Sequence, residues 1–149
     1  MDHFTSYFLD TPFVSGRVFD VFEPDSITEE ISLFFVHGGG WQAGSRTIYH
    51  KLMEAFNNRG YLCAATDYRL KGVSVFDQLQ DVREAYDHFV SWLKERGRPL
   101  KIAVCGGSAG AHLASLLLCA DPGECGDFFG SQGDFAILSS QRATLCHRC

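Results

Sequence analysis

A serine set between glycines is the residue in this sequence best placed to do chemistry. The segment Gly106-Gly107-Ser108-Ala109-Gly110 follows an apolar run directly and is followed directly by a pattern of helical spacing. A strand that turns at once into a helix holds such a serine in a strained backbone and exposes its hydroxyl at the carboxyl edge of a sheet. The helix N-terminus beside it favours developing negative charge, so this arrangement is typical of the nucleophile in acyl transfer.

The serine motif alone leaves a purely structural alternative open. Glycines at a strand–helix turn can serve only to let the two elements pack closely against each other. A phosphate-binding loop is less favoured, because the segment lacks the Gly-Lys-Ser/Thr ending that would hold phosphate and magnesium.

A second glycine-rich segment favours acyl transfer over that structural alternative. His37-Gly38-Gly39-Gly40-Trp41 follows another apolar run, and His37 lies 71 residues before Ser108 (108 − 37). Three consecutive glycines allow the backbone to turn its N–H groups inward, where they can stabilise the oxyanion of a tetrahedral acyl intermediate. Two loops at the carboxyl ends of two strands would thus supply two halves of one site, which makes a flexible loop with an unrelated histidine the weaker interpretation.

Strand-like and helix-like patterns alternate along most of the chain. The predicted strands are residues 4–9, 17–22, 31–36, 61–66, 101–105 and 135–138, and the predicted helices are 48–56, 75–96 and 109–120. The first two strands are expected to form an antiparallel pair. The alternation after residue 31 predicts an α/β fold, with a mostly parallel sheet and helices on both faces.

The spacing of apolar residues also predicts which face of each helix is buried. In the first helix the apolar face carries Ile48, Leu52, Ala55 and Phe56. The charged residues of the long helix are assigned to its solvated face: Asp77, Asp81, Arg83, Glu84, Asp87, Lys94 and Glu95.

Composition favours one folded domain and argues against a polyanionic partner. Of the 149 residues, 46% are hydrophobic and 13% are aromatic, which is enough for a sizeable core. The 13 basic and 18 acidic residues give a net charge of −5, so neither nucleic acid nor an anionic membrane surface is expected as a partner. No apolar run approaches the roughly 20 residues needed to span a bilayer, and the first residues do not match a secretory signal.

The cysteines indicate a reducing, cytoplasmic compartment. Cys63, Cys105 and Cys119 lie inside apolar runs, where a reduced core thiol is the usual interpretation. A zinc site could be assembled only from residues near the end of the chain: Cys125, Cys146, His147 and Cys149. Structural zinc is normally held by two separated pairs of ligands, so we expect no metal.

Three segments together resemble a known superfamily. They are HGGGWQAGSR at residues 37–46, DYRL at residues 67–70 and GGSAGAHLA at residues 106–114. They are similar to the α/β-hydrolase fold, and more narrowly to the esterase/lipase group that includes hormone-sensitive-lipase-like and BD-FAE-type carboxylesterases. The resemblance covers roughly residues 16–138 and implies neither a metal nor an organic cofactor.

The resemblance implies a role for each residue of the two glycine-rich loops. Ser108 would be the nucleophile. The backbone N–H groups that would form the oxyanion hole are those of Gly39, Gly40 and Ala109. His37, with Gly38 and Trp41, would shape the loop and would not be the catalytic base, and His112 would be a structural histidine.

The acid and the base of a catalytic triad are harder to find. In this fold they follow the serine in the order acid, then histidine, and only 41 residues follow Ser108 (149 − 108). The late candidates are weak, because Asp134 precedes the wrong strand and His147 lies in an unpatterned tail. The other late acids fall in predicted loops: Asp121, Glu124 and Asp127. We therefore expect a C-terminally incomplete hydrolase domain at residues 1–140 and a tail at 141–149 produced by truncation or a frame shift.

Two hypotheses follow for function. In the first, the chain is a serine hydrolase that acts on small acyl esters through an acyl-enzyme at Ser108, with amidase or formamidase activity possible within the same chemistry. In the second, the chain is a non-catalytic, truncated or degenerate hydrolase fragment. Such a fragment would expose a sheet edge, through which it could self-associate.

Overall fold

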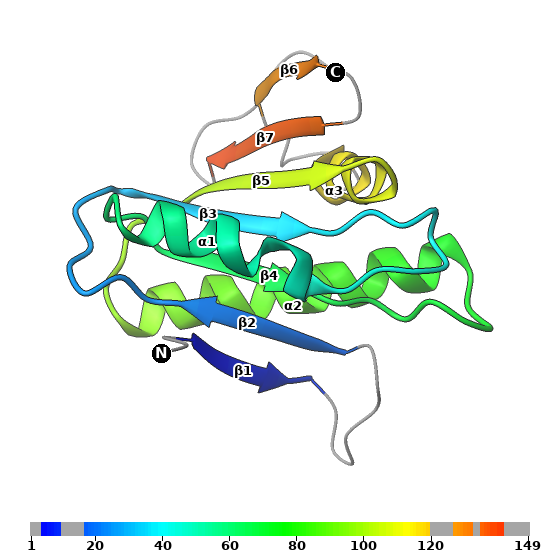
Figure 1. Ribbon diagram of the computed structural model, residues 1–149, viewed down its shortest axis with the longest axis horizontal. Coiled ribbons are helices and arrows are strands. Elements are labelled where there is room, and N and C mark those ends of the chain that lie inside the picture. Colours follow the sequence, from blue (N-terminus) through cyan, green and yellow to red (C-terminus); the bar gives the residue numbers. More distant parts are fainter. Residues whose placement is uncertain (1–3, 10–16, 120–126, 133–134, 142–149) are drawn as a thin grey trace.

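The strands form one mixed sheet, and helices cover both of its faces (Figure 1). The computed structural model describes residues 4–9, 17–119, 127–132 and 135–141. The strands are β1 (Phe4–Phe8), β2 (Val18–Phe22), β3 (Ile31–Val36), β4 (Cys63–Thr66), β5 (Lys101–Gly107), β6 (Asp127–Gln132) and β7 (Phe135–Gln141). The helices are η1 (Arg46–Tyr49), a 3-10 turn, followed by α1 (His50–Asn57), α2 (Val75–Glu95) and α3 (Ala109–Cys119). Every element predicted from the hydrophobic pattern is present, and β6 is additional.

The sheet is parallel at its centre and antiparallel on both flanks. Its seven strands lie in the order β1-β2-β4-β3-β5-β7-β6. The neighbours β4–β3 and β3–β5 pair in parallel, and β1–β2 pair antiparallel, as expected from the sequence. Parallel pairing brings the ends of β3 and β5 to the same edge of the sheet, and the two glycine-rich loops follow these ends.

The last two strands differ from the expected parallel arrangement. β7 runs antiparallel to β5, and β6 runs antiparallel to β7. Residues 133–134 alone separate β6 from β7, and so short a connection can only return the chain antiparallel. Asp127, expected in a loop, begins β6. The described sheet therefore ends at β1 and β6, and β5 is covered by β7.

The continuous apolar run of β3 is explained by helices on both faces. Successive side chains of a strand point to opposite sides of the sheet. Phe34 and Val36 belong to the larger core cluster, under α2 and α3, whereas Leu33 and Phe35 belong to the smaller cluster, under α1. Figure 1 shows α1 on the near face of the sheet and α2 behind it.

The buried face of the first helical segment is not the predicted one. Ile48 is 72% exposed, Leu52 is 40% exposed and Ala55 is also exposed, so the prediction was wrong for these three residues. The buried residue is Met53, with Tyr49 and Phe56 packed beside it. Ile48 lies in η1, where three residues make a turn, so the α-helical spacing assumed across 48–56 does not hold there.

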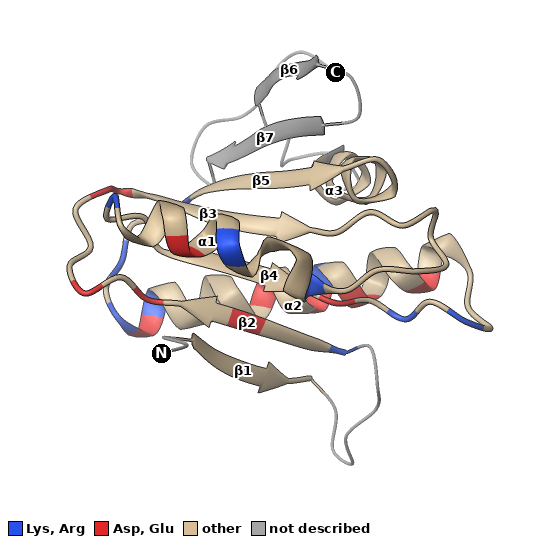
Figure 2. Ribbon diagram, in the orientation of Figure 1, with Lys and Arg blue, Asp and Glu red and all other residues tan. Residues whose placement is uncertain are grey.

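The long helix α2 begins and ends at recognisable signals. At its N-terminus Ser74 and Asp77 form a capping box, and the Ser74 backbone N–H bond lowers the pKa of Asp77. Past its C-terminus Gly97 adopts a φ of 63°, which favours glycine. Acidic and basic residues are intermixed along the described chain (Figure 2).

One acidic residue of α2 does not lie on the predicted solvated face. Asp81 is completely buried and accepts three hydrogen bonds from Arg69, one from the backbone N–H and two from the guanidinium, at 2.8–3.0 Å. A buried carboxylate needs such partners, because an unpaired buried charge is very costly. This ion pair ties α2 to the segment that follows β4.

The predicted core thiols are confirmed for two cysteines. Cys63 and Cys105 are buried and form no disulfide, and burial raises the pKa of the Cys105 thiol to about 12. The side chain of Cys119 lies outside the described part of the chain. Among the described residues there is no helix long and apolar enough to cross a membrane.

The ion pair of Asp81 gives a test of the fold. Asp81→Asn removes the buried counter-charge of Arg69, and we expect it to lower the free energy of unfolding by about 3 kcal/mol. Asp87→Asn makes the same change at an exposed position of the same helix and should cost less than about 0.5 kcal/mol. Urea unfolding followed by circular dichroism measures both, and equal losses would contradict the role given to Asp81.

Candidate active site

Ser108 lies on a sharp turn between β5 and α3. It is exposed, and its φ of 52° places it in the left-handed region that non-glycine residues rarely adopt. Its carbonyl accepts a hydrogen bond of 3.1 Å from the N–H of His112, so the first turn of α3 starts at the serine itself. The strained turn expected from the sequence is therefore present, with the hydroxyl at the carboxyl edge of the sheet.

The glycine that ends the serine motif is required by a close backbone approach. A Cβ atom on Gly110 would collide with the carbonyl oxygen of Val36 and would lie 2.6 Å from that of His37. Real side chains never come so close to backbone atoms. The start of α3 therefore packs directly on the end of β3, backbone against backbone.

The same close packing brings the second glycine-rich loop, residues 37–46 (the glycine loop), next to Ser108. A Cβ atom on Gly38 would lie 3.4 Å from the Cβ of Ser108 and 2.5 Å from the carbonyl oxygen of Gly107. The next three residues all have positive φ, with 132° at Gly39, 61° at Gly40 and 62° at Trp41. The loop thus turns sharply just beside Ser108, and the value at Gly39 is one that only glycine adopts easily.

His37 holds the start of this loop and is buried beneath it. Its Nδ1 lies 2.7 Å from the carbonyl oxygen of Gly38, so Nδ1 carries the proton and donates it. Its ring stacks on that of Tyr68, with centroids 4.3 Å apart, and the Tyr68 hydroxyl donates to the His37 carbonyl at 2.7 Å. Burial lowers the pKa of His37. A neutral, buried imidazole fits the predicted role in shaping the loop.

The end of the loop is held by a charged network. The Arg46 backbone N–H donates to Asp67 at 2.7 Å, and its guanidinium contacts both Asp67 and Asp20. Asp20 is fully buried and also accepts from Ser6 at 2.6 Å and contacts the Nε2 of His50 at 2.8 Å. The network joins β1, β2 and the end of β4 to the loop.

Trp41 lies at the centre of the loop and contacts α3, the helix that begins just after Ser108. Its ring makes a T-shaped contact with that of His112, with centroids 5.6 Å apart, and His112 lies one helical turn beyond Ser108. A groove of about 440 Å³ is lined by Trp41 together with Leu70, Val73 and the buried Gln78. This groove is bounded by the segment that continues the DYRL motif.

Sequence reasoning missed several residues that fix this geometry. Tyr68, Arg69 and Asp67 each make a defined bond, although their segment was noted only for its resemblance. Asp81 was assigned to solvent, and Gln78 was not singled out. No local pattern marks them, because their partners lie far away along the chain.

No catalytic base is found among the described residues. The Ser108 hydroxyl makes no hydrogen bond to a described side chain, His37 is buried, and His112 is exposed beside Trp41. The candidates Asp134 and His147 lie outside the described residues, as do Asp121, Glu124 and the four residues of the possible zinc site. The structure thus brings together the nucleophile candidate and the oxyanion-loop residues only.

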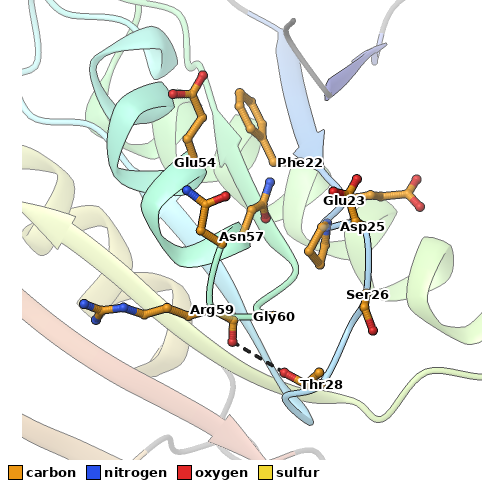
Figure 3. A pocket seen from close by; sticks show the side chains of 11 residues that line it. Phe22, Glu23, Asp25, Ser26, Thr28, Glu54, Asn57, Arg59 and Gly60 are labelled. Atoms are coloured by element: carbon orange, nitrogen blue, oxygen red, sulfur yellow. Dashed lines mark hydrogen bonds between the residues drawn. The ribbon is translucent and has the colours of Figure 1, made fainter.

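A larger hollow lies at the opposite edge of the sheet. This cavity has a volume of about 680 Å³. It is bounded by the segments that precede β3 and β4, whose side chains are drawn in Figure 3. The carboxylates of Glu23, Asp25 and Glu54 line it, and Thr28 donates to the carbonyl of Arg59 at 3.4 Å across one end. Its described lining residues include no histidine, so the chemistry is better sought at the carboxyl edge.

Comparisons with known proteins identify similar chains. The BD-FAE family model matches residues 19–137. "Kynurenine formamidase" of Drosophila melanogaster is 32% identical over 106 residues, which covers 68% of this chain and 34% of that protein. "Probable carboxylic ester hydrolase LipM" of Mycobacterium tuberculosis is 37% identical over 91 residues, which covers 56% of this chain and 20% of that protein.

The similarity extends to solved structures. The crystal structure of esterase B from Lactobacillus Rhamnosis aligns with a TM-score of 0.69 and 26% identity, covering 78% of this chain and 39% of that one. The chain spans 34%, 20% and 40% of the first three curated relatives that it matches.

The burial of His37 gives a prediction for pH dependence. Because its pKa is lowered in the folded state, the unfolded chain takes up the proton first as the pH falls below about 6.5. The free energy of unfolding should therefore decrease from about pH 6.5 downward, by about 1.4 kcal/mol for each unit by which the pKa is lowered.

Urea unfolding between about pH 7.5 and 5 measures this dependence. His37→Asn should show a smaller decrease than the parent, whereas His88→Asn, at an exposed position of α2, should keep the parent's decrease. The same decrease in the parent and in His37→Asn would rule out His37 as its source.

Proposed function

The chain belongs to the BD-FAE family, and from this premise we propose that it is a serine carboxylic-ester hydrolase acting on small acyl esters. Its fold is that of the α/β-hydrolases, and its esterase relatives support hydrolysis of carboxylic esters at the level of the family. One observation carries the proposal. The glycine loop and the strained serine are in backbone contact at the carboxyl edge of the sheet.

In the proposed mechanism the Ser108 Oγ attacks the ester carbonyl carbon. A base outside the described residues takes the hydroxyl proton, and the carbonyl oxygen becomes an oxyanion. The N–H groups of Gly39, Gly40 and Ala109 donate to this oxyanion. The tetrahedral intermediate then expels the alcohol, which receives the proton, and leaves an acyl group on Ser108. Water attacks this acyl-enzyme and releases the carboxylic acid.

The local geometry supports this division of roles. Ala109 is the first residue of α3, so its N–H has no acceptor within the helix and lies next to the serine. The positive φ values at Gly39 and Gly40 turn the loop backbone sharply where it meets Ser108. His37 is buried, and its Nδ1 is bonded to the Gly38 carbonyl, so it is not placed to take the proton of Ser108. The base is left to a later residue, for which Asp134 with His147 remain the weak candidates.

A formamidase activity is the second candidate within the same chemistry. The likeness to a kynurenine formamidase is the observation that favours it. An amide differs from an ester in its leaving group, because the nitrogen must be protonated as it departs. The same nucleophile and oxyanion hole would serve both substrates. The residue that protonates the leaving group therefore determines whether an amide is hydrolysed as well as an ester.

Other expectations remain predictions. They are the cytoplasmic location, the division at residues 140 and 141, the absence of nucleic-acid and membrane partners, and self-association through a sheet edge, for which β1 and β6 are the described candidates. The non-catalytic fragment is the alternative that an activity assay must address.

Hydrolysis of p-nitrophenyl acetate tests the proposal. Ser108→Ala removes the nucleophile and should lower kcat by at least about 10³-fold relative to the parent chain. Ser115→Ala is the matched control, since among the described residues this hydroxyl bonds to the Ala111 carbonyl of its own helix alone, and activity should stay within about twofold. Formanilide, assayed beside the ester, distinguishes formamidase from esterase.

Two results would count against an esterase in this chain. Equal turnover by the parent and Ser108→Ala would mean that hydrolysis occurs elsewhere. A folded parent without turnover on ester or formamide would favour the non-catalytic alternative.

A further inference from the structure

Gln78 of α2 holds the middle of the glycine loop. It is 2% exposed, and its amide nitrogen donates to two carbonyl oxygens of the chain, that of Trp41 at 2.8 Å and that of Arg69 at 2.9 Å. Trp41 belongs to the loop beside Ser108, and Arg69 belongs to the segment after β4. One buried side chain therefore joins a helix to two loops that are 37 and 9 residues away along the sequence.

The orientation of this amide is fixed by chemistry. Its Nε2 carries two hydrogens, and both are used by carbonyl oxygens that can only accept. A rotated amide would place its oxygen against these two oxygens. The Oε1 atom is buried and has no partner among the described residues. The side chain thus gives up its acceptor in order to donate twice, which indicates that the two donated bonds are what this position provides.

Trp41 needs such support. Its φ of 62° is unfavourable for a bulky residue, and a strained backbone persists only where surrounding contacts hold it. The bond from Gln78 fixes its carbonyl, and the contact with His112 fixes its ring. Gly39 and Gly40 precede it directly and also have positive φ values, which glycine adopts without strain.

The two ends of the loop are held by other residues. Tyr68 bonds the carbonyl of His37 at the start, and Asp67 bonds the backbone of Arg46 at the end. Between them, the carbonyl of Gly39 accepts hydrogen bonds from within the loop, from the N–H groups of Gln42 and Ala43. Among the described residues, the hydrogen bond that anchors the centre of the loop from outside is therefore the one from Gln78.

We propose that Gln78 is a positioning residue, which fixes the N–H groups of Gly39 and Gly40 toward Ser108 by holding the Trp41 carbonyl. Its effect on the position of Trp41 stands on the structure alone. Its effect on catalysis rests on the proposed function, because a misplaced oxyanion donor matters only if an oxyanion forms.

Fluorine NMR tests the positioning without any need for activity. The chain has two tryptophans, so labelling with 5-fluorotryptophan gives two resonances, which Trp41→Phe assigns. Gln78→Met removes both donated bonds at nearly constant size and adds no charge. We expect the Trp41 resonance to shift or broaden by more than its linewidth. The Trp92 resonance should stay in place, because that ring is buried in the core and bonded to Tyr7.

Gln80→Met is the matched control. Gln80 lies on the same helix, is exposed, and within the described part of the chain its side chain bonds to Glu84 alone. Its replacement should leave both resonances unchanged. If Gln78→Met fails to fold, Gln78→Asn serves instead, since the shorter amide keeps polarity but cannot reach both carbonyls. A Trp41 resonance that is unchanged in a folded Gln78 variant overturns the proposal.

Kinetics on p-nitrophenyl acetate add the catalytic consequence. In Gln78→Met, kcat should fall by about 10–100-fold while KM changes by less than about threefold, because the oxyanion bonds form only in the transition state. A parent without turnover would contradict the proposed function and leave the NMR result to decide the role of Gln78. A moved Trp41 resonance with unchanged kcat would overturn the catalytic part of the proposal.

Discussion

The backbone contact between α3 and the end of β3 is the constraint on which the site depends. At Gly110 the helix comes so close to the carbonyls of Val36 and His37 that no side chain fits between them. Since β3 and β5 are parallel neighbours, the residues after each strand are forced together at one edge. The distance from Ser108 to the glycine loop is therefore set by main-chain packing, which side-chain motion cannot relax.

Around this contact, polar side chains from distant segments hold the loop in an unfavourable conformation. Tyr68 and Asp67 fix its two ends, and Gln78 fixes its centre. These residues follow β4 or lie on α2, so the strand next to β3 and the helix behind it both support the loop. A positive φ at a tryptophan can persist because the surroundings supply these bonds.

The sequence predicts the elements well because their apolar patterns are local. The run at 31–36 and the spacing of 75–96 correspond to β3 and α2 with little change. The two glycine loops were also identified in advance, since the strained turn and the close approach demand particular residue types. Burial of polar residues was not predictable in the same way. Asp81 was assigned to solvent because its partner, Arg69, reaches it only after the chain has folded.

The two faces of the sheet are unequal, and this asymmetry sets an order of local opening. Under α2 and α3 lies the larger core, whereas η1 and α1 together bury one residue completely, Met53, and leave Ile48 and Leu52 to solvent. Segments with few buried contacts open at lower free energy than the global transition. Amide protons of α1 should thus exchange with deuterium before those of α2. The glycine loop leads into η1 and α1. It is therefore held firmly where it contacts the backbone at Ser108, whereas the segment that follows it has few buried contacts.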